Sequence, residues 1–337
     1  MKILVYLFLV VLLFGCIGGK TEPPPPNPEP PPVQNNTQVN IIVGGQTNQT
    51  VGQNATVVPV QNNTPVVEGL EYEYDPSQSI GVYFIDVGMQ GQHGNAILIK
   101  KGDLDVLIDA GPAETANKVV NFLRAKGVDD LEVIISTNAD PRQYGGIQTV
   151  ANNFRIEEYW WSGDSFGDST YSQLFDNMVA ATKEVKQIEV GVSYDLNGMN
   201  FTFLNPQKSR FNDINNDAVV TKISDRNFSL LLTSGIQTGA QGKLMTTQTK
   251  LMESEIMQAP YYGVGSGTSN IGLFLITAKS KEIIITGSSD DSASNGGSRE
   301  PFQRLMLQYG MHWSETYNKS GVRIFSNGYG YLIEETE

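Results

Sequence analysis

The chain has 337 residues, and 36 acidic against 23 basic residues give it a formal net charge of -13. Because a grip on nucleic-acid phosphates needs clustered Lys and Arg, this charge argues against DNA or RNA as a partner. Cys16 is the single cysteine of the sequence. We therefore expect no disulfide within the chain and no thiolate metal site in its folded part.

The first 16 residues have the pattern of a secretory signal. Lys2 is followed by an apolar run from Ile3 to Phe14, which is too short for a mature transmembrane helix. The letters LFGC at its end resemble the lipobox of prokaryotic lipoproteins, in which the cysteine receives the lipid. We expect a lipoprotein signal peptide, lipidation of Cys16, and anchoring at the cell surface, on the outer face of the cytoplasmic membrane. A plain signal peptide with an incidental cysteine is the alternative.

Residues 17–78 are predicted to be a disordered tether. EPPPPNPEPPP favours a polyproline II rod, and the QNNT-like repeats that follow have too few apolar side chains to offset the entropy of ordering. A flexible coil of roughly 60 residues spans about 45 Å on average, so the domain would stand clear of the lipid. Sequons arise by chance in such text, but seven of them are candidate glycosylation sites. They are Asn35, Asn48, Asn54, Asn62, Asn200, Asn227 and Asn318.

Residues 79–337 alternate between strand-like and helix-like patterns. Apolar runs bounded by glycines and turn residues predict the following strands: 80–88, 95–102, 103–112, 130–137, 199–206, 218–223, 228–235 and 282–289. Apolar residues at helical spacing predict these helices: 114–128, 145–154 and 299–310. The alternation is typical of one continuous α/β domain.

Several blocks of this domain, in order, resemble metallo-β-lactamase-fold domains of the ComEC type, named for the DNA-uptake competence protein. FIDVG, GNAILI and VLIDAGP resemble the opening blocks, and IISTNADPRQYGGI falls where the family has Thr-His-x-Asp-x-Asp-His-x-Gly-Gly. FSLLLTSG, QAPYYGVGSGTS and YNKSGVRIFSNGYGYLI follow the later blocks. The resemblance implies a four-layer αββα sandwich. It also implies two metal ions at the sheet edge, held by histidines and aspartates, and hydrolysis of phosphodiester or similar bonds.

The positions that match the family's metal ligands carry other residue types. The first and closing histidines fall on Asn138 and Gln143, and the two aspartates between them fall on Asp140 and Arg142. Asp140 alone is a good ligand, whereas Arg142 places a permanent positive charge where a dication would bind.

Two later blocks depart from the family in the same way. The bridging aspartate falls on Gly235, and a histidine pair falls on Tyr261 and Tyr262. We therefore expect that the dinuclear site is lost and that no metal cofactor is bound. We further expect the Arg142 guanidinium to replace the metal electrostatically by pairing with Asp140 or Asp109, while the tyrosines fill the imidazole volume.

Three functions remain open at this point. The favoured one is a non-catalytic binding or envelope component that recognises an unknown envelope or exported ligand. The second is a phosphodiesterase-like or nuclease-like hydrolase with a rebuilt oxygen-rich site for Zn or Mn. The residues of that site would be Asp86, His93, Asp109 and Asp140. The third is a purely structural envelope protein.

Three smaller expectations concern residues near the supposed site. His93 lies in the glycine-rich loop MQGQHGN, which favours a surface histidine, whereas His312 beside Trp313 is expected to pack. Asp86 and Asp109 are expected to accept backbone hydrogen bonds in tight glycine turns. Residues 160–171, WWSGDSFGDSTY, are expected either to form an aromatic loop for a sugar or peptide or simply to pack.

Overall fold

The computed structural model describes the domain and the backbone of two short strands before it. The described parts of the domain are residues 77–89, 92–264, 272–287, 298–317 and 319–336. The predicted signal peptide, most of the predicted tether and several predicted modification sites lie outside the described residues. These sites are Cys16, Asn35, Asn48, Asn54, Asn62 and Asn318. Within the predicted tether, β1 (Val57–Pro59) pairs antiparallel with β2 (Pro65–Val67).

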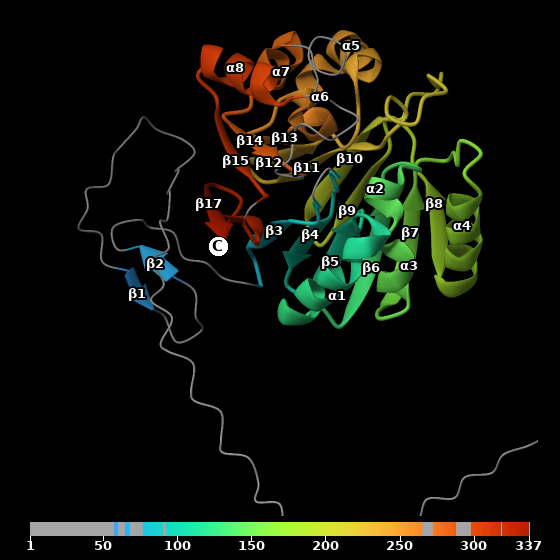
Figure 1. Cartoon of the computed structure of the whole chain (residues 1–337). Helices are drawn as coiled ribbons and strands as arrows, with labels where there is room; N and C mark the ends of the chain where they lie inside the picture. The colour runs from blue at the N-terminus through green and yellow to red at the C-terminus, as the bar shows by residue number, and fades with distance from the viewer. Residues whose placement is uncertain are drawn as a thin grey trace, which may run out of the picture. The chain divides into compact units, whose positions relative to one another are not determined.

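One half of the domain is an eight-stranded mixed sheet with the strand order β17-β16-β3-β4-β5-β6-β7-β8 (Figure 1). Its strands are β3 (Ile80–Ile85), β4 (Ile97–Lys101), β5 (Leu104–Ile108), β6 (Asp130–Ser136), β7 (Arg155–Trp161), β8 (Glu184–Gln187), β16 (Gly321–Ser326) and β17 (Tyr331–Thr336). Strands β5 to β8 run parallel to one another, so their carboxyl ends share one edge of the sheet.

The other half is a seven-stranded mixed sheet with the order β15-β14-β13-β12-β11-β10-β9. Its strands are β9 (Ser193–Leu196), β10 (Met199–Asn205), β11 (Val220–Asp225), β12 (Phe228–Leu232), β13 (Ile256–Gln258), β14 (Glu282–Ile285) and β15 (His312–Glu315). Strands β12 to β15 are parallel, and their carboxyl ends again share one edge.

Helices cover the outer face of each sheet (Figure 1). Over the first sheet lie η1 (Ala113–Thr115), α1 (Ala116–Ala125), α2 (Pro141–Tyr144), α3 (Ile147–Ala151) and α4 (Ser169–Ala181). With the second sheet belong α5 (Thr238–Thr247), α6 (Thr249–Met252), η2 (Pro260–Gly263), α7 (Gly272–Ala278) and α8 (Glu300–Gln308). None of the helices in the described parts is long and apolar enough to cross a membrane.

Three apolar cores account for the layering. The central core joins side chains of both sheets, such as Ile97 and Val106 from one and Phe201 and Leu230 from the other. A second core lies between the first sheet and α1, α3 and α4, and a third lies between the second sheet and α5 to α8. Strand β5 is buried at every position, and its residues are apolar except Asp105, which pairs with Lys100; a largely apolar sequence is typical of a strand covered on both faces. The predicted four-layer αββα sandwich is therefore confirmed.

The predicted elements are found, with several more between them. The strand and helix predictions correspond to β3, β4, β5, α1, β6, α3, β10, β11, β12, β14 and α8. Of the two alternatives expected for residues 160–171, packing describes their aromatic side chains. Trp160 is fully buried in β7, Trp161 packs on Phe175, and Asp168 caps α4 by accepting from the backbone N–H of Tyr171. These aromatic side chains serve packing.

Candidate functional site

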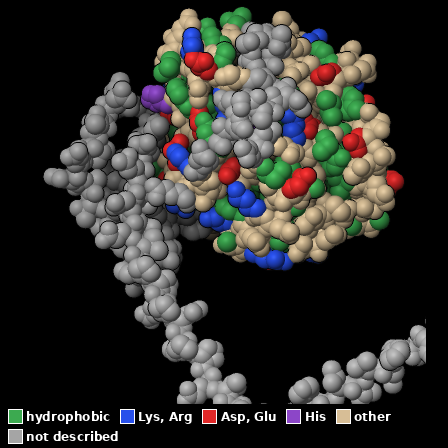
Figure 2. All heavy atoms as spheres, viewed as in Figure 1, with side chains coloured by type: hydrophobic (Ala, Val, Ile, Leu, Met, Phe, Trp, Pro, Cys, Tyr) green, Lys and Arg blue, Asp and Glu red, His purple; other side chains and the backbone are tan. Residues whose placement is uncertain are grey.

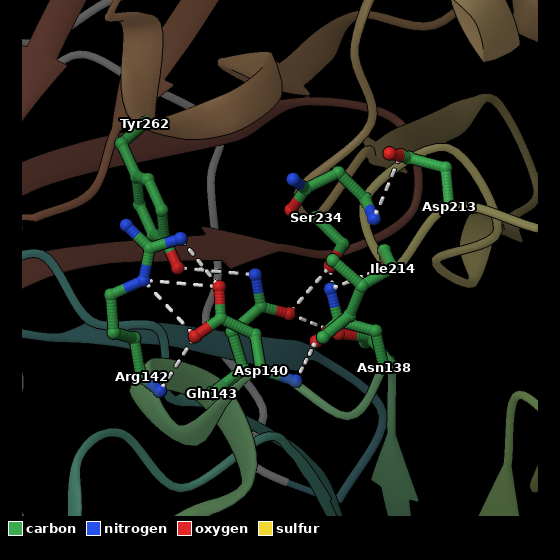
Figure 3. A network of polar contacts seen from close by, with 10 residues as sticks. Asn138, Asp140, Arg142, Gln143, Asp213, Ile214, Ser234 and Tyr262 are labelled. Atoms are coloured by element: carbon green, nitrogen blue, oxygen red, sulfur yellow. Dashed lines mark hydrogen bonds and ion pairs between the residues drawn. The ribbon is translucent and has the colours of Figure 1, made fainter. Parts of the chain in front are cut away.

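The two sheets bring the carboxyl ends of four strands to one edge of the sandwich. Asp109 follows β5, Thr137 follows β6, Ser234 follows β12, and Tyr261 follows β13. These loops carry the positions at which the family resemblance implies metal ligands, and Figure 3 shows how their side chains meet. We call this group of loops the site edge. It is polar, with buried side chains from segments far apart in the sequence.

Local sequence explains how the loop after β6 is built. Asp140 caps α2 by accepting from the backbone N–H of Arg142, and Pro141 occupies the first helical position. A Cβ atom at Gly145 would lie 2.5 Å from the Pro141 carbonyl oxygen, and one at Gly146 would lie 2.2 Å from the Ala110 carbonyl oxygen. The paired glycines are therefore needed for close backbone approach, whatever chemistry the loop performs.

Arg142 forms a local ion pair with Asp140. The guanidinium donates from Nε to both carboxylate oxygens at 3.0 Å and from Nη2 to Oδ2 at 2.5 Å (Figure 3). The side chains are 20% and 8% exposed, so solvent screens the pair only in part. Burial opposes the charge of Arg142, but the hydrogen bonds and charge of Asp140 outweigh it and raise the Arg142 pKa further. Of the two partners expected for Arg142, the structure has Asp140.

Two tyrosines flank the Arg142 guanidinium. Its central carbon lies 5.8 Å from the ring centroid of Tyr261 and 5.4 Å from that of Tyr262, within cation–π range. Both tyrosines are buried and adopt left-handed backbone angles, with φ of 46° and 59°. Such angles cost free energy for bulky residues and persist only where the surroundings impose them. The two positions at which the family resemblance implies a histidine pair thus hold tyrosine rings within cation–π range of the Arg142 guanidinium.

A neutral hydrogen-bond cluster lies beside this ion pair. Thr137 Oγ1 is 2.7 Å from Asp109 Oδ2, 2.5 Å from Gln143 Oε1 and 2.7 Å from Ser234 Oγ. One hydroxyl hydrogen cannot serve three oxygens. The Thr137 hydroxyl can donate to Asp109 or to Gln143, and the Ser234 hydroxyl, 2.9 Å from Gln143 Oε1, is a second donor to that amide oxygen.

Burial is the main influence on the pKa of Asp109. Asp109 is fully buried, and burial raises its pKa to about 7, although it accepts from the Thr137 backbone N–H and from Asn95. Its backbone φ of 56° holds the carboxyl group in place. Asp109 does accept a backbone hydrogen bond, but the donor is Thr137 after β6 and not, as was expected, a residue of its own glycine turn.

The remaining matched positions hold amides or no side chain. Gln143 donates from Nε2 to the Tyr262 hydroxyl at 3.1 Å, and Asn138 donates to the Ile214 carbonyl at 3.1 Å. Asn138 also accepts from the backbone N–H of Asp140. A Cβ atom at Gly235 would lie 3.1 to 3.3 Å from side-chain atoms of three neighbours, Gln143, Asn215 and Asn138. A larger side chain at Gly235 would have to displace these amides.

His93 and His312 differ from their predicted settings. His93 is fully buried, stacks on Tyr262 with ring centroids 5.0 Å apart, and its Nδ1 lies 3.3 Å from Arg299 Nη2. Burial, together with the charges of Arg299 and Arg142, lowers the His93 pKa to about 3, so the ring is neutral. The surface prediction for His93 is therefore wrong. His312 is also corrected, since its side chain is 65% exposed and contacts Glu282 rather than packing inside.

The four residues of the alternative metal site are not brought together as a ligand set. Asp86 pairs with Lys118 at 3.1 Å and accepts from the backbone N–H of Gly88, as predicted for a glycine turn. Asp140 is bound to Arg142, and His93 lies beside Arg299. In the described residues, three or more His, Cys, Asp or Glu side chains nowhere gather in a group that could hold a metal ion.

The residues at the site edge do not fit a pair of metal ions. A dinuclear site needs several neutral or anionic donors converging on each ion. Here the carboxylate of Asp140 is bound by a guanidinium, Asn138 and Gln143 use their amides for protein hydrogen bonds, and Gly235 offers no donor.

On the face shown in Figure 2, acidic and basic side chains are interspersed rather than gathered by sign.

Sequence reasoning missed the neutral partners that complete the edge. Gln258 accepts from the backbone N–H groups of Thr233 and Ser234 and donates to Asn95, which in turn donates to Asp109. Neither residue carried a sequence signal for this role: Asn95 lies two residues before β4, and Gln258 is the last residue of β13, a strand that was not predicted.

Comparisons with known proteins place the fold in context. No model of a known protein family matches the chain. The chain is similar to the uncharacterized protein YcaI of Escherichia coli strain K12, with 24% identity over 143 residues, which are 42% of this chain and 18% of that protein. The chain thus spans less than a fifth of the length of this curated relative.

Solved structures similar to the chain are described as metallo-β-lactamase-fold or metal-bound proteins. One is the metallo-β-lactamase fold protein YhfI of Bacillus subtilis, with 13% identity and a TM-score of 0.49, covering 74% of this chain and 100% of that one. Another is Zn²⁺-bound PqqB of Methylobacterium extorquens, with 12% identity and a TM-score of 0.46, covering 72% and 99%.

Proposed function

We propose that this protein is a lipid-anchored cell-surface protein with a ComEC-like metallo-β-lactamase fold, that it has lost the dinuclear chemistry, and that it works by binding an envelope or exported ligand. The observation that carries the proposal is the Arg142–Asp140 ion pair. It puts a fixed cation on the best remaining carboxylate, while neutral amides and hydroxyls use their hydrogen-bonding capacity on one another.

The direction of the chain supports presentation of the site edge away from an anchor. The described domain begins at Ser77, and the start of β3 pairs with Ser326 at the end opposite the site edge. In this proposal the chain from the anchor would reach β3 at the end of the sandwich opposite the site edge. Asn200 and Asn227 are exposed, which makes both sequons accessible to glycosylation in an organism that has the machinery.

Two assays on the full chain test this proposal. The first measures hydrolysis of bis(p-nitrophenyl) phosphate with added Zn²⁺ or Mn²⁺, comparing the wild type with Asp140→Asn and with the surface control Asp130→Asn. We expect no turnover that depends on Asp140. Turnover that is lost in Asp140→Asn and kept in Asp130→Asn would favour the metal-dependent hydrolase instead. The second assay follows Cys16→Ser in cell fractions, where loss from the membrane fraction is expected.

A further inference from the structure

The helix layer over the second sheet exposes an unusual share of large apolar side chains. Eight large hydrophobic residues are exposed in the described domain. Five of them lie in α6, α7 or α8 or directly follow α8. They are Leu251, Leu273, Ile276, Leu307 and Tyr309, which are 46%, 58%, 43%, 66% and 36% exposed. The layer over the first sheet has one such residue among its described helices, Val179 of α4.

These residues belong to neighbouring helices. α7 contacts α5 and α6, and a Cβ atom at Gly272 of α7 would lie 3.4 Å from Leu305 and 3.2 Å from Tyr309. Leu273 and Ile276 are three residues apart on α7, so they project from one side of that helix. In Figure 1, α5, α7 and α8 lie together over the second sheet. We call the exposed surface of α5 to α8 the outer helix face.

The outer helix face is more basic than the chain as a whole. Its exposed basic side chains are Lys243, Lys250, Lys279, Lys281 and Arg304. Two acidic side chains in the described residues from Thr238 to Tyr309 pair with basic ones at this surface: Glu300 with Arg304, and Glu253, which is 40% exposed, with Lys279. The five exposed basic side chains still outnumber these two acidic ones. The described helices over the first sheet expose two acidic residues and two basic ones, which are Glu114, Asp176, Lys118 and Arg124, whereas helices α5 to α8 themselves expose Lys243, Lys250 and Arg304 against Glu300. The outer helix face therefore combines apolar and basic side chains within a chain of net charge -13.

We propose that the outer helix face docks on the surface of an anionic lipid bilayer. Apolar side chains that project singly from helices, interspersed with lysines, match the interface of a membrane whose surface is negative. A second copy of the chain fits less well, because a two-fold contact through this face would set its basic residues against one another. The proposal rests on the lipid anchor of the proposed function. A tether from Cys16 would be long enough for the domain to stand clear of the lipid, but it would also keep the domain close enough to the bilayer to raise the effective concentration of lipid.

The test uses the full chain carrying Cys16→Ser, so that no lipid anchor contributes. Sedimentation with phosphatidylcholine vesicles is compared with sedimentation with vesicles that also contain phosphatidylglycerol, at low salt. We expect binding only to the anionic vesicles. Leu273→Ser with Ile276→Ser should weaken it about tenfold, and Lys250→Glu with Lys281→Glu should weaken it by at least about tenfold. The matched control Val179→Ser, on the other helix layer, should bind as the parent does.

Three results would overturn the proposal. One is equal binding to neutral and anionic vesicles. Another is binding that the α7 pair of substitutions and Val179→Ser affect equally. The third is absence of vesicle binding together with a dimer, measured by light scattering, that Leu273→Ser with Ile276→Ser abolishes. The substituted side chains of the domain are exposed, and circular dichroism checks that each variant is folded. Because Cys16→Ser removes the anchor from every sample, failure of lipidation in cells leaves these outcomes unchanged.

Discussion

Two ion pairs at opposite ends of the sandwich have different structural roles. At the far end, Lys101 at the end of β4 reaches across to Asp225 of β11 at 3.0 Å, with both side chains less than 10% exposed. At the site edge, Arg142 binds Asp140 only two residues away. The far pair joins the two sheets, whereas the near pair neutralises a carboxylate locally.

Neutral contacts join the sheets at the site edge instead. Thr137 contacts Ser234 at 2.7 Å, and Gln143 donates to Tyr262 at 3.1 Å. The sequence resemblance to ComEC-type domains implies that metal ions would link ligands from these loops. Here hydrogen bonds make that link, and a guanidinium supplies the positive charge. A pair of metal ions can both neutralise carboxylates and join the two sheets. In this protein Arg142 neutralises Asp140, and other residues, such as Thr137 and Ser234, join the sheets.

The largest effect is expected at the far pair. Lys101→Met leaves Asp225 buried without its cation, which should lower the free energy of unfolding by about 3–5 kcal/mol. Urea unfolding followed by fluorescence measures this loss. The double variant Lys101→Met with Asp225→Leu should recover most of it, because an apolar pair leaves no buried charge. If Lys101→Met were neutral, the far pair would not clamp the sheets.

A smaller loss is expected for Arg142→Ala. Its removal deprives Asp140 of hydrogen bonds to a charged donor, and we expect a loss of about 1.5–3 kcal/mol in the free energy of unfolding. Lys118→Ala, which breaks the more exposed pair with Asp86, is the matched control and should cost at most about 1 kcal/mol. A rise in stability on Arg142→Ala would contradict the role given to this residue.

The smallest effect at neutral pH is expected for Asp109→Asn, which mimics the protonated acid. The folded-state pKa of Asp109, raised to about 7 by burial, lies above the ordinary value, so the unfolded chain loses its proton first as pH rises. The stability that Asp109 contributes should be fully present below about pH 4 and be lost as pH rises toward 7. Asp109→Asn should flatten this part of the stability profile, measured by urea unfolding at several pH values. An unchanged slope would place the Asp109 pKa near its ordinary value.

The fold could be predicted because the local spacing of apolar residues indicates which positions of a strand or helix are buried. β5 is apolar except for Asp105, and α1 carries apolar residues at helical spacing, so each could be assigned without its neighbours. The positions of Asn138, Arg142 and Gln143 at the site edge followed from the family resemblance.

The contacts within the site edge could not be predicted in the same way. Gln143 and Ser234 are 91 residues apart, and Gln258 and Asn95 are 163 apart, so their hydrogen bonds depend on how the two sheets meet. His93 was assigned to the surface from its glycine-rich loop, but Tyr262 from a distant segment covers its ring. Polar loop residues carry no local signal that separates a solvated turn from a buried network.

The metal content of the purified full chain tests the central claim most directly. Zinc, manganese and iron are measured by inductively coupled plasma mass spectrometry after incubation with each ion and gel filtration. Wild type and Asp140→Asn are compared. The account predicts far less than one ion per chain in both, because the donors of the site edge are bound to one another and to Arg142. One or two ions per wild-type chain, lost in Asp140→Asn, would contradict it.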